Sequence, residues 1–128
     1  MYKVTKRMEI AACHMLSLPY DSKCKNLHGH NWIITVTCAA DELTKYGMVI
    51  DFTAIKKLIH DKLDHSYLND TIKVNPTAEN MCKWIDDTIT KYLDDSDEYP
   101  YDTYCERVTV QESEGNIATY CKYEQGEV

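Results

Sequence analysis

Residues 24–36 read Cys24-Lys25-Asn26-Leu27-His28-Gly29-His30-Asn31-Trp32-Ile33-Ile34-Thr35-Val36. Side chains two residues apart in a β-strand lie on one face, so His28 and His30 should project together. The same face continues along a strand that we expect over residues 31–39, with apolar side chains at Trp32, Ile34, Val36 and Cys38. Two imidazoles placed in this way supply two-thirds of the protein ligands of a catalytic zinc ion.

A third histidine ends an earlier strand. Residues 2–13 alternate between apolar and polar side chains, which predicts a half-buried strand whose apolar face ends at His14. Residues 15–27 include Pro19-Tyr20-Asp21-Ser22 and indicate a loop. All three histidines therefore lie at strand ends on the apolar faces. We predict that they bind one metal ion and leave a fourth position for water or substrate.

Two other interpretations of the histidines stay open at this point. Each histidine alone is compatible with a half-buried structural role. A structural zinc site would instead take Cys13 or Cys24 as its fourth ligand. Cys13 has the opposite parity to His14 on its strand, so its side chain should point to the other face.

Two helices follow these strands. Asp51 can cap a helix that begins at Phe52, and a second helix begins near Asn75-Pro76-Thr77, with the proline at an early position. The expected apolar stripe of the first helix is Phe52, Ile55, Leu58, Ile59 and Leu63, and that of the second is Ala78, Met81, Cys82, Ile85, Ile89 and Tyr92. The acidic segment 94–98 is most simply a solvated connection.

The chain closes with two more strands, which we expect at about 104–112 and 117–123, joined by a turn at 113–116. The element order is then β-β-α-α-β-β. Strands grouped in hairpins around two helices indicate an α+β protein with a four-stranded antiparallel sheet. We find no internal repeat or boundary, so residues 1–128 should form a single domain.

Composition narrows the range of possible partners and locations. The 128 residues carry a net charge of −7, which argues against nucleic acid as the main partner, because phosphate binding needs a basic face. No apolar stretch approaches the length of a membrane span, and no signal peptide is evident. We therefore expect a cytoplasmic protein whose six cysteines are thiols. These are Cys13, Cys24, Cys38, Cys82, Cys105 and Cys121.

Two further sites have the residue types of proton-transfer chemistry. Cys24 lies between Lys23 and Lys25, whose charges favour a thiolate that could act as a base beside the metal. Its simpler interpretation is a loop thiol or a zinc ligand. Asp64-His65 is either a carboxylate-oriented proton shuttle or a surface acid beside a cation at a helix end, and spacing does not choose between the two.

Glu112 belongs by parity to the apolar face of its strand, where an unpaired carboxylate would be costly. It therefore needs a lysine or arginine, or a ligand with paired N–H donors. The amino-pyrimidine edge of a pterin or guanine presents such a pair. The alternative is that Glu112 lies exposed in the turn.

Five blocks of the chain, in order, resemble the 6-pyruvoyl-tetrahydropterin synthase superfamily. The blocks are Cys24-Lys-Asn-Leu-His28-Gly-His30-Asn, Gly47-Met-Val-Ile-Asp51-Phe, Leu63-Asp64-His65-Ser-Tyr-Leu-Asn69, Asn75-Pro-Thr-Ala-Glu79-Asn80 and Val110-Gln-Glu112-Ser-Glu-Gly-Asn116. The three residues between Cys24 and His28 are similar to the spacing in the bacterial 6-carboxy-tetrahydropterin synthases of the 7-deazaguanine (queuosine) pathway.

The resemblance implies a tunnelling fold with two helices on one face of the sheet. It also implies a homohexamer of two stacked trimers, each closing a barrel, with active sites at subunit interfaces. It implies that His14, His28 and His30 hold zinc, that Cys24 accepts a proton, and that Asp64 and His65 relay protons. Glu112 would anchor the pterin and assist the relay.

The implied substrate is 7,8-dihydroneopterin triphosphate, and the implied products are 6-carboxy-tetrahydropterin, acetaldehyde and triphosphate. Many relatives carry a basic residue directly after the first histidine, where this chain has Met15, so Lys23 and Lys25 become candidates to hold the triphosphate. The alternative functions are elimination of triphosphate by a pyruvoyl-forming synthase and a non-catalytic zinc-containing module that binds pterins or purines.

Overall fold

The computed structural model describes residues 1–123, and residues 124–128 of the predicted domain lie outside that range. Its sheet has five strands in the order β3-β1-β2-β4-β5. Four of them are antiparallel neighbours: β1 (Tyr2–His14), β2 (His28–Ala40), β4 (Tyr104–Ser113) and β5 (Asn116–Cys121). The short strand β3 (Ser66–Tyr67) pairs in parallel with β1.

The predicted α+β class is confirmed, but the prediction of a four-stranded, wholly antiparallel sheet is wrong. β3 adds a fifth strand at the edge and makes the sheet mixed. A strand of two residues is too short to show the alternation by which strands are recognised in a sequence.

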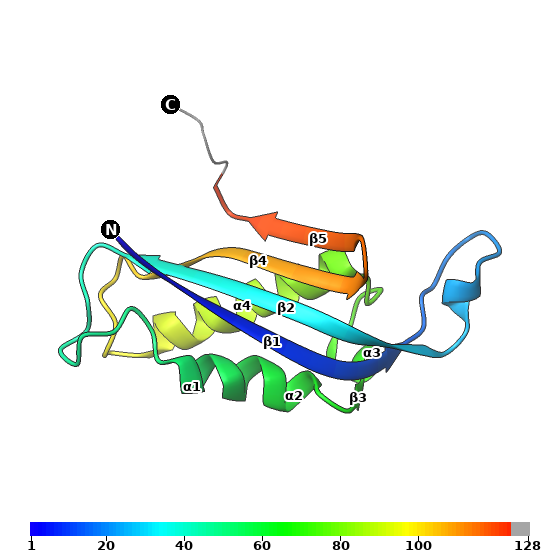
Figure 1. Cartoon of the computed structure of the whole chain (residues 1–128), viewed down its shortest axis with the longest axis horizontal. Coiled ribbons are helices and arrows are strands. Elements are labelled where there is room, and N and C mark those ends of the chain that lie inside the picture. Colours follow the sequence, from blue (N-terminus) through cyan, green and yellow to red (C-terminus); the bar gives the residue numbers. More distant parts are fainter. Residues whose placement is uncertain (124–128) are drawn as a thin grey trace.

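Helices cover one face of the sheet (Figure 1). Residues 52–63 form one helical segment made of α1 (Phe52–Ile55), a π-helical stretch η2 (Lys56–His60) and α2 (Asp61–Leu63). The long helix is α4 (Ala78–Asp95). Two shorter elements are η1 (Lys23–Lys25), a 3₁₀ turn in the β1–β2 loop, and α3 (Leu68–Thr71). No helix within residues 1–123 is long and apolar enough to span a membrane.

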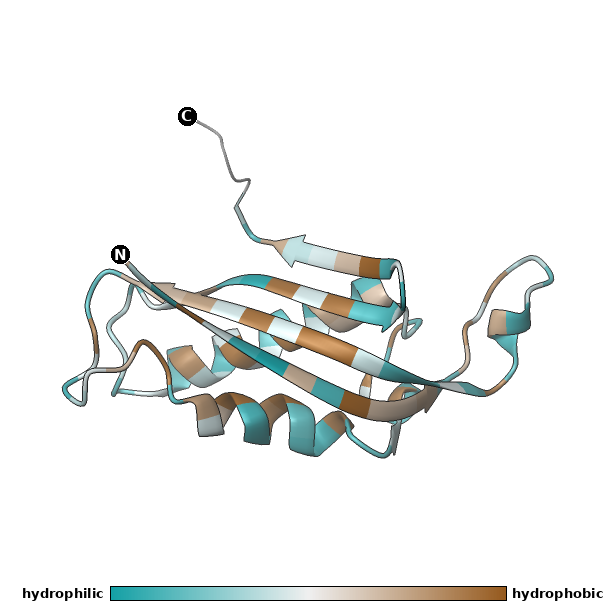
Figure 2. Ribbon diagram, in the orientation of Figure 1, coloured by the Kyte–Doolittle hydropathy of each residue, from teal (hydrophilic) through white to brown (hydrophobic). Residues whose placement is uncertain are grey.

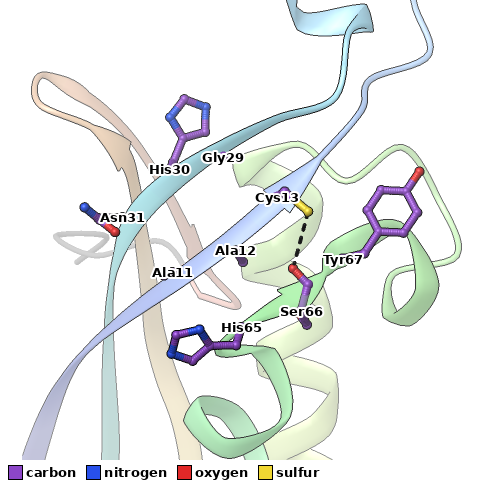
Figure 3. Close-up of a pocket in the computed structure, with 9 residues that line it drawn as sticks. All are labelled: Ala11, Ala12, Cys13, Gly29, His30, Asn31, His65, Ser66 and Tyr67. Atoms are coloured by element: carbon purple, nitrogen blue, oxygen red, sulfur yellow. Dashed lines mark hydrogen bonds between the residues drawn. The ribbon is translucent and has the colours of Figure 1, made fainter.

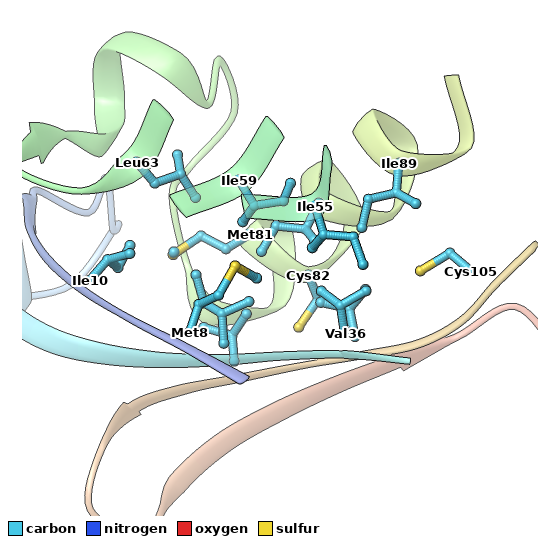
Figure 4. Packing of buried hydrophobic residues seen from close by; sticks show 14 of the residues in the cluster. Met8, Ile10, Val36, Ile55, Ile59, Leu63, Met81, Cys82, Ile89 and Cys105 are labelled. Carbon is cyan, nitrogen blue, oxygen red and sulfur yellow. The ribbon is translucent and has the colours of Figure 1, made fainter. Parts of the chain in front are cut away.

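The hydrophobic core lies between the sheet and these helices (Figure 4). Even-numbered positions of β1 and β2 face it and odd-numbered positions face away, which is the alternation seen along β2 in Figure 2. The helices contribute side chains at helical spacing, from Ile55, Ile59 and Leu63 on one side and Met81, Ile85 and Ile89 on the other.

Three expectations about the helices need correction. Phe52 is 46% exposed, because it lies at the first position of α1 beyond the stripe that reaches the sheet. Pro76 precedes the helix, since the Thr77 side chain caps α4 by accepting a hydrogen bond from the Asn80 N–H. The acidic segment begins inside α4, which continues to Asp95.

The Ile34→Ala variant tests the core. Ile34 is fully buried on the central strand β2, so removing its side chain should lower the free energy of unfolding by about 2–5 kcal/mol. Ile117→Ala is the matched control, because Ile117 lies on the edge strand β5 and is 58% exposed. In urea denaturation, Ile117→Ala should lower the free energy of unfolding by no more than about 0.5 kcal/mol, which is the usual size of a surface change. Equal costs for the two variants would contradict this packing of the core.

Candidate metal centre and active site

Strand register brings the three histidines together. In the β1–β2 ladder His14 lies directly opposite His28, and His30 lies opposite Ala12 on the same face. Their rings form a close cluster, with centroids 4.5 Å apart for His14 and His28 and 4.9 Å apart for His28 and His30. Trp32, the next residue on this face of β2, is fully buried and packs edge-on against both His14 and His30.

Glu112 joins the cluster from β4. The β4–β5 register shifts between Gln111 and Ser113, so Glu112 is the bulged residue of its strand. Its Oε1 atom lies 3.3 Å from His14 Nε2 and 3.1 Å from His30 Nε2. The partners of this carboxylate are therefore histidines, rather than the lysine or arginine considered from the sequence. Within residues 1–123, these four side chains form the one group whose ligand atoms all lie within 4.8 Å of one another.

Hydrogen bonds orient two of the imidazoles. His14 Nδ1 lies 2.8 Å from the carbonyl oxygen of Pro76, and His28 Nδ1 lies 2.6 Å from that of Asn26. A carbonyl only accepts, so each Nδ1 carries the proton and donates it. Each neutral ring then has a lone pair at Nε2, and the two Nε2 atoms face each other at 3.0 Å. A cation between them removes the repulsion, and backbone carbonyls commonly orient metal-binding histidines in this way.

Burial keeps His14 in the form that a metal ion requires. Its side chain is fully buried, and desolvation lowers the pKa of the imidazole, although the Pro76 carbonyl opposes the shift. The buried His30 Nε2 makes no aligned hydrogen bond with any described residue. Neutral rings with inward lone pairs and an unsatisfied buried nitrogen fit a divalent metal ion, and three histidine nitrogens with a carboxylate suit zinc.

Cys24 lies near this group in the chain but is not part of it. It sits in η1, where its N–H donates to Ser22 Oγ and its carbonyl accepts the N–H of Leu16. These bonds fold the β1–β2 loop back on itself. The side chain is half-buried, and its sulfur is not among the four gathered ligand atoms.

Asp64 and His65 lie at the sheet edge, next to β3. The Asp64 carboxylate accepts the N–H of Ala11 at 2.9 Å, and the His65 N–H donates to the Ala11 carbonyl at 2.7 Å. His65 adopts a left-handed backbone conformation with φ 55°, and its side chain is 83% exposed. Backbone strain of this kind costs about 1–3 kcal/mol and is concentrated at functional sites.

The chain does not bring His65 to the histidine cluster. His65 lines a cavity of about 640 Å³ together with residues of β1 and β2 that include His30, one of the clustered histidines. His65 is nevertheless outside the group of gathered ligand atoms. Figure 3 shows His65 beside β1 and His30 beside β2, where both line this cavity.

The sequence analysis missed His60. Its Nδ1 atom lies 3.1 Å from Asp61 Oδ1, and its Nε2 atom lies 3.7 Å from Asp64 Oδ2, the same oxygen that His65 Nε2 approaches to 3.5 Å. The i, i+4 spacing of His60 and Asp64 was the available signal. His60 ends the π-helical stretch, a feature that is frequent near functional sites.

Asp64 should make the stability of the protein depend on pH. Its hydrogen bond from the Ala11 N–H lowers the pKa of the carboxyl below the ordinary value of 3.8. A carboxyl group whose pKa is lower in the folded protein than in the unfolded chain stabilises the fold at pH values above its ordinary pKa. This contribution is lost as the pH falls through the pKa that the group has in the folded state. Asp64→Asn should therefore reduce stability at pH 7, and its deficit should shrink towards pH 3 in urea denaturation. A deficit that is constant over this range would contradict the assignment.

Known proteins resemble this chain over most of its length. The family model for 6-pyruvoyl tetrahydropterin synthase matches residues 3–123. The 6-carboxy-5,6,7,8-tetrahydropterin synthase of Bacillus subtilis (strain 168) is 33% identical over 129 residues, covering 95% of this chain and 84% of that protein. The enzyme of the same name from Synechocystis sp. is 36% identical over 94 residues, covering 66% of this chain and 72% of that protein.

The fold has relatives among solved structures. The 6-pyruvoyl tetrahydropterin synthase of Caenorhabditis elegans superposes with a TM-score of 0.70 at 24% identity, covering 95% of this chain and 96% of that one. The family match over nearly the whole chain and the similarity to the Bacillus subtilis protein lead to one conclusion. The chain belongs to the 6-pyruvoyl tetrahydropterin synthase family.

Proposed function

We propose that the chain is a zinc-dependent 6-carboxy-tetrahydropterin synthase of the 7-deazaguanine (queuosine) pathway. It is a lyase that converts 7,8-dihydroneopterin triphosphate and one water molecule into 6-carboxy-tetrahydropterin, acetaldehyde and triphosphate. The observation that carries the proposal is the cluster of His14, His28 and His30, with lone pairs of His14 and His28 facing each other. Family membership and the names of the two bacterial relatives support the choice of substrate.

Each side chain of the proposed active site has its own role in the reaction. His14, His28 and His30 would hold a zinc ion, and the bound ion would polarise the hydroxyl groups of the substrate side chain and lower their pKa. Cys24 accepts a proton from that side chain, and Asp64 orients His65 to relay protons as the ring is reduced internally. Glu112 anchors the amino-pyrimidine edge by accepting its paired N–H donors. The reaction draws its electrons from the substrate itself.

The triphosphate is held by the β1–β2 loop. Lys23 and Lys25 are exposed on either side of Cys24 and line a surface hollow with Ser22 and Asn26. Met15 cannot provide a charge, and its backbone is tied to Asn69, which donates to the Met15 carbonyl and accepts its N–H. The two lysines therefore take over the anion contacts that a basic residue would make in the place of Met15.

A second copy of the chain completes the site. Within one chain His65 is outside the group of gathered ligand atoms, and we infer that the Asp64–His65 relay of each site comes from a neighbouring copy. Both edges of the sheet have backbone that can pair with a second copy. Among the described strands, β5 pairs only with β4, and β1 pairs with β3 only at Ala12 and Cys13. The strand directions make β5 antiparallel to β1, so one copy's β5 can extend the next copy's sheet.

Because the two edges are different surfaces, repetition of that pairing gives a head-to-tail assembly, which closes into a ring where the rotation between copies allows it. We infer a barrel of three single-domain chains and a hexamer of two stacked trimers. Size-exclusion chromatography with light scattering should give six times the 14.9 kDa chain mass. A monomer that turns over substrate at full rate would contradict the shared site.

Product analysis tests the function. The zinc-loaded protein is incubated with 7,8-dihydroneopterin triphosphate, and the released fragments are identified by mass spectrometry. Acetaldehyde and triphosphate in equal amounts are expected. Triphosphate without acetaldehyde would instead indicate a pyruvoyl-forming synthase. Tight binding without any product would indicate a non-catalytic pterin-binding module.

A further inference from the structure

Glu112 occupies the place of a fourth metal ligand. Zinc–nitrogen and zinc–oxygen bonds of about 2.0–2.1 Å give a tetrahedron whose ligand atoms are about 3.3–3.4 Å apart. Three separations in the cluster are close to that length: 3.0 Å for His14–His28, 3.3 Å for His14–Glu112 and 3.1 Å for His30–Glu112. The carboxylate thus stands in the position that water or substrate was expected to take.

A direct hydrogen bond does not account for this placement. His14 already donates its Nδ1 proton to the Pro76 carbonyl, so the Nε2 atom facing Glu112 has a lone pair and no proton. His30 Nε2 makes no aligned hydrogen bond with the carboxylate although it lies 3.1 Å away. Two nitrogens and a carboxylate oxygen at these distances are better explained by a shared cation than by hydrogen bonds.

Glu112 also faces a second environment. It lines a cavity of about 270 Å³ with Glu79, Asn116 and Ile117, at the start of α4 and β5. As the bulged residue between Gln111 and Ser113, it is free of the regular β4–β5 ladder. Its side chain is 26% exposed, so a change of rotamer does not disturb the core. The same carboxylate can therefore turn either to the metal ligands or to the cavity.

We propose that Glu112 is the fourth ligand of the metal ion in the substrate-free protein, and that it leaves the ion when an amino-pyrimidine ring arrives. This inference rests on the proposed function, because it assigns the ring to the Glu112 carboxylate. The exchange opens a coordination position on the ion only when a ring is present to donate its N–H groups to the carboxylate. It also keeps water from a fixed position on the ion in the empty site.

Cobalt(II) provides the test, because its visible spectrum reports the ligands of the ion without turnover. Wild-type protein loaded with Co²⁺ is compared with Glu112→Gln and with the control Glu114→Gln, which changes an exposed residue of the neighbouring turn. Glu112→Gln should alter the spectrum and weaken Co²⁺ affinity by at least about tenfold. Glu114→Gln should match the wild type. Identical spectra and affinities for all three proteins would overturn the proposal.

The exchange is tested by adding 6-methyl-7,8-dihydropterin, which has the ring but neither the triphosphate nor the side-chain hydroxyl groups that could bind the ion themselves. The wild-type Co²⁺ spectrum should change as the carboxylate leaves, and an unchanged spectrum at ring saturation would overturn the exchange. Thermal unfolding of the metal-free variants checks that they fold, and Glu112→Ala serves as a second variant. If the expected products are not formed but the Co²⁺ spectrum still depends on Glu112, the proposed reaction is wrong. The assignment of Glu112 as the fourth ligand is then unaffected.

Discussion

The His28→Ala variant should purify without bound zinc and should release no measurable acetaldehyde from 7,8-dihydroneopterin triphosphate. His28 supplies one of the three imidazole nitrogens, and its lone pair faces that of His14 at 3.0 Å. Loss of a residue that merely orients a ligand weakens metal binding by about 10–100-fold, so loss of a ligand should cost at least about a hundredfold. Metal content after dialysis, measured by mass spectrometry, gives the result directly.

The contrast with His65→Ala makes this experiment specific. His65 is outside the group of gathered ligand atoms, so His65→Ala should keep one zinc ion per chain while losing turnover. The metal-free His28→Ala protein should remain folded, because the core between the sheet and the helices does not include His28. A variant that unfolds with the loss of zinc would show a structural metal site instead.

Cys24→Ala should lose turnover by about 10²–10⁴-fold, the usual contribution of a positioned proton acceptor. Zinc content should be unchanged, because the Cys24 sulfur is outside the group of ligand atoms. Binding of 7,8-dihydroneopterin should also stay near the wild-type value, since the assigned ring anchor is Glu112. Single-turnover kinetics and equilibrium titration separate the two effects.

Cys121→Ala is the matched control for Cys24→Ala. Cys121 is half-buried at the end of β5, its sulfur is outside the group of gathered ligand atoms, and no role in the reaction is assigned to it. Its turnover should equal that of the wild type. Full activity in Cys24→Ala would show that another group accepts the proton, and loss of zinc there would make the thiol a metal ligand.

Strand parity was enough to predict the cluster of imidazoles. Because His14, His28 and His30 continue the apolar faces of two long strands, only the pairing of those strands was needed to bring them together. Both strands have thirteen residues, and their alternation is regular over most of that length. The core positions of α4 followed from helical spacing in the same way.

The missed features depend on contacts between distant segments. The carbonyl that orients His14 belongs to Pro76, 62 positions later in the chain. Glu112 reaches the cluster through a bulge, and a bulge has no alternation to mark it in advance. β3 exists because the backbone after Asp64 is tied to Ala11 by hydrogen bonds, and two residues leave no periodic pattern in the sequence.

X-ray absorption at the zinc edge of the purified protein tests the metal centre most directly. One zinc ion per chain is expected, bound by three imidazole nitrogens and one oxygen at about 2.0–2.1 Å. A sulfur ligand at about 2.3 Å would identify a cysteine as a permanent fourth donor. That result, or fewer than three imidazoles around the ion, would contradict the assignment of His14, His28 and His30 as the ligands of a catalytic zinc ion.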